Sequence, residues 1–162
     1  MAGAQVNYMI AEGFRDCLLR TTAVQDLLAD TGAGTTTYRL YPSTAPQSAI
    51  ENEPTSYVTY FIVSRSIARH LRGPCGMAET RIQVDVYART YILAQEIAET
   101  IRENTDGFNG EVSGTNGSMV LRGVRLEDMR DQYEYGDSSE SGWHRVSLDF
   151  AMWHSQSIAV AV

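Results

Sequence analysis

The densest group of residues that could carry out chemistry is a run of carboxylates at positions 127–140. It comprises Glu127, Asp128, Asp131, Glu134, Asp137 and Glu140. Neighbouring carboxylates can bind a divalent cation or act as an acid and base pair. The run lacks the alternating Asp/Asn spacing and central glycine of a calcium-binding loop. We therefore favour a solvated strand end and turn, and keep a small metal-dependent hydrolase as a remote alternative.

The three histidines are isolated from one another and from any nucleophile. His144 and His154 stand at the two ends of one predicted strand, roughly 30 Å apart at ~3.3 Å per residue, too far to share a metal ion within one subunit. His70 belongs to a separate segment. The sequence also contains no phosphate-binding loop, GxSxG elbow, HExxH pair or CxxC pair. We therefore expect no catalytic residue, no metal and no cofactor.

Arg69, His70 and Arg72 form a small basic group on an otherwise acidic protein. The chain has 20 acidic residues against 13 basic ones, a net charge of −7. Specific nucleic-acid binders usually carry a basic surface, because phosphate contacts dominate their affinity. We expect no specific DNA binding, and we interpret the basic group as a candidate contact with carboxylates of a neighbouring subunit. A merely solvated loop is the competing interpretation.

The segment 79–108 supplies the clearest elements that could position these residues. Ile82, Val84 and Val86 alternate with polar residues, which predicts a strand with one buried face. After Thr90, a plausible N-cap, apolar residues recur every three or four positions and predict an amphipathic helix. The predicted core joins this strand and helix to the last strand: Ile82, Val84, Val86, Ala94, Ile97, Ile101, Val146, Leu148 and Phe150.

The remaining elements follow from the same rules. We expect two helices within residues 6–30, with Thr22 capping the second, and strands at 36–41, 57–66, 119–131 and 143–154. In the strand 119–131, Val120, Val124 and Leu126 should face inward, with a bulge at Gly123. The connections are predicted as a loop at 42–54, a loop or hairpin arm at 67–77, a glycine-rich link at 106–118 and a turn at 132–142.

This order of elements predicts an α+β fold, with a mostly antiparallel sheet and helices packed on one face. At 162 residues, the chain is expected to form a single domain over 1–154 with a C-terminal tail at 155–162. No apolar run is long enough to cross a bilayer, and the N-terminus lacks the pattern of a secretory signal. We therefore expect no membrane association, and folding in the cytosol.

Several blocks of the sequence resemble, in type and order, the tail-completion or tail-terminator family, whose members join tail to head in long-tailed bacteriophages and gene transfer agents. The blocks are LYPSTAPQ, SYVTYFIVS, TRIQVDVYARTYILAQEIAETIRENTDGFNG, VRLEDMRDQYEYG and WHRVSLDFAMWH, together spanning roughly 36–154. The link at 109–118 is longer and richer in glycine than this family suggests, and the tail at 155–162 extends beyond its usual end.

The resemblance implies a non-catalytic structural protein of the virion, assembled in the host cytoplasm. Its subunits would form a homohexameric ring that caps the tail tube and docks on the head connector, while DNA passes through without specific binding. Glu127, Asp128, Asp131 and Glu134 are then candidates for the lumen or rim, because carboxylates repel phosphates. Arg69, His70 and Arg72 are candidates for the interface. The alternative is another neck component, a head-completion or adaptor protein.

Overall fold

The computed structural model describes residues 9–30, 34, 36–51, 55–136 and 142–156. Six strands form the main sheet in the order β3-β4-β5-β8-β7-β6. Their bounds are β3 (Leu40–Pro42), β4 (Ser56–His70), β5 (Gly73–Ala88), β6 (Gly110–Gly114), β7 (Gly117–Glu134) and β8 (Trp143–Ser155). The helices are α1 (Ile10–Leu18), α2 (Thr22–Leu28), α3 (Gln47–Glu51) and α4 (Tyr91–Thr105), and β1 (Ala29–Asp30) pairs with β2 (Thr37–Tyr38) in a small second sheet.

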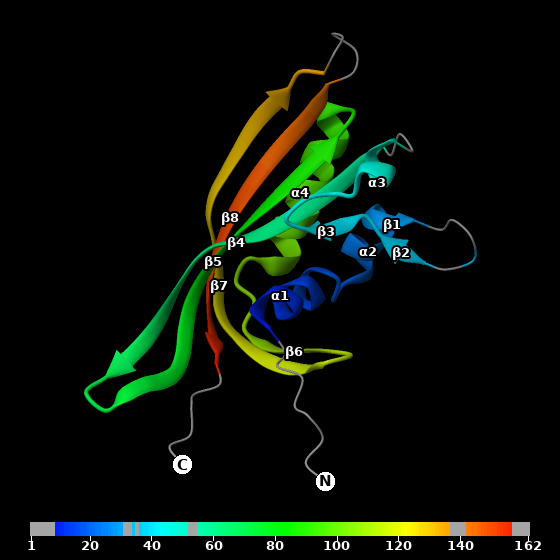
Figure 1. The fold of residues 1–162 in the computed structure, drawn as a ribbon. Helices are drawn as coiled ribbons and strands as arrows, with labels where there is room; N and C mark the ends of the chain where they lie inside the picture. The colour runs from blue at the N-terminus through cyan, green and yellow to red at the C-terminus, as the bar shows by residue number, and fades with distance from the viewer. Residues whose placement is uncertain (1–8, 31–33, 35, 52–54, 137–141, 157–162) are drawn as a thin grey trace.

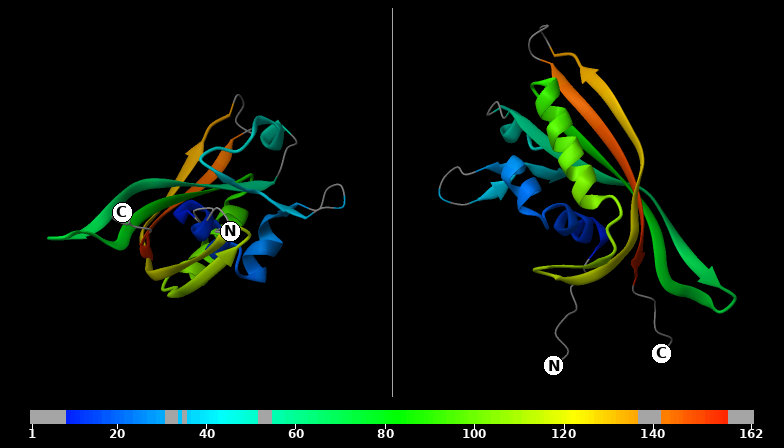
Figure 2. Two further views of the ribbon diagram at one scale, coloured as in Figure 1. Left: turned by 60° about the horizontal axis from the view of Figure 1, so that its bottom comes forward. Right: turned by 180° about the vertical axis from the view of Figure 1, so that it is seen from behind.

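The main sheet is mixed and curled, which corrects the prediction of a mostly antiparallel sheet with helices on one face. The expected combination of helix and strand is present, but β3 runs parallel to β4. The sheet bends around α1 and α4 instead of lying flat beneath them (Figures 1 and 2). Bulges contribute to this bend, because an extra residue in one strand increases the local twist. One register shift lies between Arg122 and Arg125, where Gly123 adopts a positive φ of 58°, as the predicted bulge requires.

The predicted core is confirmed. All nine of its residues are buried in one cluster, at 0–1% exposure. Antiparallel pairing sets Ile82 opposite Phe150 and Val84 opposite Leu148, so the alternating apolar residues of β5 and β8 reach the same side. Helix α4 packs its apolar stripe there, and it begins at Thr90, whose Oγ1 accepts a hydrogen bond from the Leu93 N–H at 3.3 Å.

The segment 67–77 is a hairpin arm, one of the two forms expected for it. β4 pairs with β3 only at residues 58–60, and β5 pairs with β8 only from Met77 onward. Residues 61–67 of β4 still pair with residues 78–83 of β5 at the edge of the sheet, and past Ile67 and Met77 the two strands continue as a two-stranded ribbon that leaves the body of the molecule (Figure 1). We use the name hairpin arm for residues 62–77, which comprise this ribbon and the adjoining edge of β4 that β3 does not cover.

Other predicted boundaries were wrong. The link 106–118 contains β6, which pairs with β7 through a tight turn at residues 115–116, and β7 runs on to Glu134 into the expected turn. Met119 and Leu121 are buried where Val120 was expected to be. The strand expected at 36–41 is split into β2 and β3, and the loop at 42–54 contains α3. Thr22 is the first residue of α2 rather than its cap.

Candidate functional site: the outer sheet face and the hairpin arm

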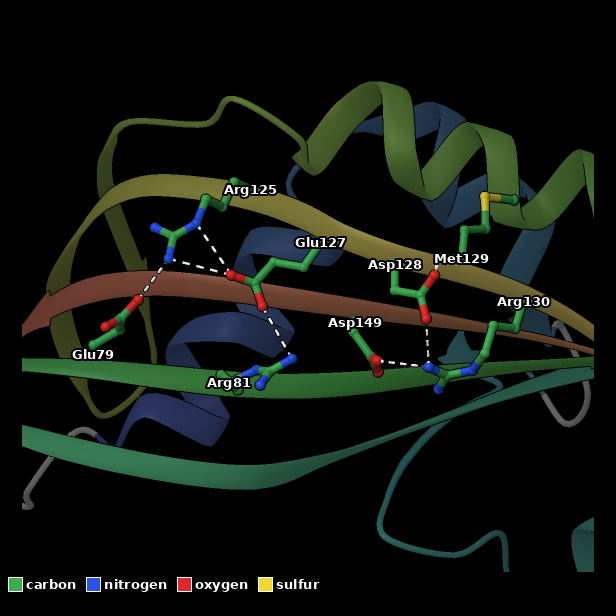
Figure 3. Close-up of polar contacts among 8 residues, drawn as sticks. All are labelled: Glu79, Arg81, Arg125, Glu127, Asp128, Met129, Arg130 and Asp149. Carbon is green, nitrogen blue, oxygen red and sulfur yellow. Dashed lines mark hydrogen bonds and ion pairs between the residues drawn. The ribbon is translucent and has the colours of Figure 1, made fainter.

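The four carboxylates proposed for a lumen or rim lie along β7 and are exposed. They do not converge on a common point. Three of them, Glu127, Asp128 and Glu134, point to the outer sheet face, by which we mean the side of β5, β8 and β7 opposite the helices. Figure 3 shows Glu127 and Asp128 there, alternating with arginines. A second register shift, between Leu126 and Asp128, brings Glu127 and Asp128 to this side together.

The first group of charges on the outer sheet face is balanced. Arg125 lies 2.6 Å from Glu79 and 3.3 Å from Glu127, and Arg81 lies 3.0 Å from the other oxygen of Glu127 (Figure 3). The hydrogen bond to Glu79 raises the pKa of Arg125. Two acids and two bases therefore cancel, and Glu127 has no free oxygen that would favour a divalent cation.

The other two groups each hold one arginine between two acids. Arg130 lies 2.6 Å from Asp128 and 3.1 Å from Asp149 (Figure 3). Arg145 lies 2.9 Å from Asp85 and 3.0 Å from Glu134. These groups carry the excess of negative charge on the outer sheet face.

Asp85 is the buried member of this arrangement, with its side chain 3% exposed. Besides Arg145, it accepts hydrogen bonds from the Ser147 hydroxyl at 2.6 Å and from the Gln83 amide at 2.9 Å. Burial opposes the charge on Arg145, but the hydrogen bond and the charge of Asp85 outweigh it and raise the pKa of Arg145. Asp85 is therefore a buried carboxylate that is paired with an arginine.

Asp131 points to the helix side, where its Oδ2 accepts a hydrogen bond from the Tyr91 hydroxyl at 3.3 Å. The negative charge of Asp131 raises the pKa of Tyr91. Tyr91 and Tyr133 both pack edge-on against His144, and Tyr133 packs against Tyr135. Tyr91, Ile92, Tyr133 and Tyr135 are all exposed at this end of the sheet, and we call these four residues the distal patch.

The histidines have separate structural surroundings, as the sequence predicts. His154 is buried, with its Nε2 2.7 Å from the Thr80 hydroxyl and its Nδ1 2.9 Å from the Ser155 carbonyl. Burial lowers its pKa. Over the described part of the chain, no three residues among the histidines, cysteines and carboxylates are grouped to hold a metal ion. Asp137 and Glu140, the last two acids of the sequence run, lie outside the described residues.

Arg69, His70 and Arg72 lie together at the tip of the hairpin arm, and all three are exposed. The His70 Nδ1 accepts a hydrogen bond from the Arg72 backbone N–H at 3.0 Å, across the turn at residues 71–72. Apolar side chains accompany them: Ile62, Val63, Ile67 and Leu71 are exposed along the same arm. These four residues were not predicted as a surface feature, although Ile67 and Leu71, which continue the apolar pattern past the predicted end of the strand at 57–66, were a usable signal.

The cysteines differ in accessibility. Cys17 belongs to the buried face of α1, and burial raises its pKa to about 11, which suppresses the thiolate needed for nucleophilic chemistry. Cys75 is exposed on the hairpin arm. None of the described helices is long and apolar enough to cross a membrane.

Comparison with known proteins gives a structural likeness only. No family model and no curated protein matches the chain. Among 22 matching chains of solved structures is one from the virion of a native gene transfer agent particle. The likeness covers 92% of this chain and 99% of that chain, with a TM-score of 0.54 and 15% sequence identity. At this identity the likeness shows that the two chains share a fold.

Proposed function

We propose that the chain is a structural protein of a phage-like or gene transfer agent particle. The observation that carries this proposal is the shared fold with a chain of a gene transfer agent virion, which extends over nearly the whole length of both chains. The order of sequence blocks between positions 36 and 154 points to the same class of protein by a separate route.

Within that class, we propose the role of tail terminator. In this role, subunits of the chain form a homohexameric ring that ends the tail tube and docks on the head connector. A ring needs contacts between two different surfaces of each subunit. The projecting hairpin arm offers one such surface. Among the described residues its strand edges are unpaired beyond β3 and β8, and they can accept a strand from another molecule.

The charge of the chain suits a channel that passes DNA without holding it. With a net charge of −7, the protein repels phosphates over most of its surface. We place Glu127, Asp128, Asp131 and Glu134 at the lumen or its rim. Because the group around Glu127 is balanced by arginines, the repulsion comes chiefly from the acid pairs around Arg130 and Arg145.

We further propose that the chain has no catalytic activity. Glu127, Asp128 and Glu134 each form an ion pair with an arginine. A metal ion would have to compete with these arginines for the carboxylate oxygens. The remote alternative of a metal-dependent hydrolase would need those ion pairs to open. An assay for hydrolysis with added Mg²⁺ or Mn²⁺ tests this part, and an activity lost in Asp128→Asn/Glu134→Gln would contradict it.

The decisive experiment is to locate the chain in a particle. Antibody or gold labelling of intact particles should mark a single band between tail and head, and averaged images of that band should show six-fold symmetry. Labelling of the capsid or of the whole tail would contradict the tail-terminator role. Twelve-fold symmetry on the head side would favour an adaptor instead.

A further inference from the structure

Large apolar side chains are exposed at two places on the described surface. Of the nine such residues, four belong to the hairpin arm and four to the distal patch, and Met9 is the ninth. Leu71, at the tip of the arm, is fully exposed, and Tyr135 in the distal patch is 86% exposed. Exposed apolar groups that gather in this way mark surfaces that bind another protein.

The two surfaces carry opposite charges. The arm holds Arg65, Arg69 and Arg72, and no Asp or Glu occurs between positions 55 and 78. None of these three arginines forms an ion pair with an acid of the described residues. Asp131 lies beside the distal patch on the helix side of β7, whereas Glu134 borders the patch from the outer sheet face, where it pairs with Arg145; both carboxylates are exposed. Opposite charges beside apolar groups are complementary.

The two surfaces lie at opposite ends of the molecule. In Figures 1 and 2 the arm projects from one end of the sheet, whereas the end of β7 and the start of α4 lie at the other. The arm of a chain therefore cannot reach the distal patch of the same chain. The matching surface is available only on a second copy.

We propose that the hairpin arm of one subunit docks on the distal patch of the next copy of this chain. Arg69 and Arg72 would face Asp131 and Glu134, and Leu71 would pack among the tyrosine rings. Such a head-to-tail contact joins two different surfaces, so repeated rotation can close a ring. The inference rests on the proposed ring function and refines it: Asp131 and Glu134 move from the lumen or rim to the contact between subunits, and Glu127 and Asp128 stay at the lumen or rim.

Charge reversal on the purified full chain tests the contact. Arg69→Glu/Arg72→Glu should weaken self-association by about a hundredfold or more in sedimentation velocity, because acids would then face acids. Asp131→Arg/Glu134→Arg should have the same effect from the other side. Mixing the two variants should restore assembly, since each arm then meets a patch of opposite charge.

Arg69→Glu can also be tested alone, and Arg122→Glu is its matched control. Arg122 is an exposed arginine of β7 that belongs to neither the hairpin arm nor the distal patch, so Arg122→Glu should leave self-association unchanged. Thermal melts show whether each variant is folded. Assembly that survives both double variants, or that does not return on mixing, would overturn the inference. A wild-type chain that remains monomeric at all concentrations would overturn it as well.

A cross-link reports the same contact without reversing any charge. Cys75 is exposed on the arm, so Tyr135→Cys places a second thiol in the distal patch. A short bis-maleimide should link these chains into dimers and higher multimers, and the addition of Cys75→Ser should abolish the ladder. A Tyr135→Cys chain that assembles but gives no ladder would contradict the contact.

The inference and the tail-terminator role can fail separately. If rings form but do not depend on the arm, the inference is wrong and the role stands. If arm-dependent rings form but label a part of the particle other than the junction of tail and head, the role is wrong and the contact stands.

Discussion

Asp85 shows how a single residue organises the outer sheet face. Its buried carboxylate is held by Arg145, Ser147 and Gln83, so the cost of burying a charge is offset by three polar contacts. By contrast, Asp128 on the same face has a half-exposed side chain and forms an ion pair that is screened by water. The two acids look alike in sequence, but burial makes their contributions to stability different.

Asp85→Ala should therefore lower the free energy of unfolding by about 3 kcal/mol, because it leaves Arg145 partly buried with one remaining partner. Urea unfolding followed by circular dichroism measures this loss. Asp128→Ala, which also removes an acid from an arginine, is the control and should cost much less. Equal losses in the two variants would show that Asp85 is not a buried structural charge.

His154 should make stability depend on pH. Burial lowers its pKa below the ordinary 6.5, and the nearby charge of Arg65 acts in the same direction, against the hydrogen bond with the Ser155 carbonyl. The unfolded chain then binds more protons in acid, so the contribution of His154 is full above pH 6.5 and is lost as the pH falls toward the lower folded value.

The free energy of unfolding should accordingly fall more between about pH 7.5 and pH 5 in wild type than in His154→Gln, because the unfolded-state pKa near 6.5 lies in that window. Other titrating groups are common to both proteins and cancel in the comparison. His70→Gln, which replaces an exposed histidine at the tip of the hairpin arm, is the control for the substitution itself. Parallel profiles for wild type and His154→Gln would contradict the assignment.

At the scale of elements, the start of α4 joins the best-predicted strand to the best-predicted helix. The Thr90 hydroxyl accepts the Leu93 N–H, one of the amides that a helix leaves without a partner. Thr90→Ala should cost about 1 kcal/mol of unfolding free energy, whereas Thr90→Ser keeps the oxygen and should cost less. Chemical denaturation of the three proteins checks this, and an equal effect of Ala and Ser would rule out capping.

An element could be predicted from the sequence where the periodicity of its own apolar residues marks it as a strand or a helix. β5, α4 and β8 were found because one face of each is buried in a common core, which imposes a period of two or of 3.6 on the residues. Residues 110–114 were read as a link because their glycines weaken any strand pattern. They form β6 because β7 provides a complete set of hydrogen-bonding partners, and this pairing is a tertiary effect.

The candidate site was predicted in its parts but not in its arrangement. Arg69, His70 and Arg72 were recognised as a basic group, and the acids at 127–134 as a separate feature. The arginines that balance those acids were not predicted, because Arg81 and Arg145 come from other strands and reach the acids of β7 only through the register of the sheet. The parallel pairing of β3 was missed for the same reason.

At the scale of the whole molecule, basic residues gather on the hairpin arm, and acidic residues gather on the outer sheet face and beside the distal patch. The arm is basic, while the chain as a whole has a charge of −7, so the remainder is more acidic than the total suggests. In the ring that we propose, this division would let the arms make contacts while acids line the path of DNA. Non-specific repulsion of this kind acts over about 8 Å at physiological salt, close enough to matter for a polymer inside a narrow channel.

Glu127 and Asp128 take no part in the proposed contact between subunits, so reversing their charge should slow the passage of DNA. Glu127→Lys/Asp128→Lys, carried into particles, should retain assembly, because neither residue belongs to the arm or the distal patch, and should delay release of DNA in a fluorescence assay. Added salt should remove the delay, since screening weakens the attraction to phosphates.

The control is Glu96→Lys/Glu103→Lys, which changes the charge by the same amount on exposed positions of α4. This helix lies on the other side of the sheet, within its curl (Figure 2). If both variants delayed release equally, net charge rather than its position would be responsible. If neither did so, or if the ring reconstruction showed a channel lined mainly by Arg and Lys, the acids at 127–128 would not face DNA. A delay confined to Glu127→Lys/Asp128→Lys would place the outer sheet face toward the channel, and so fix the orientation of each subunit in the ring.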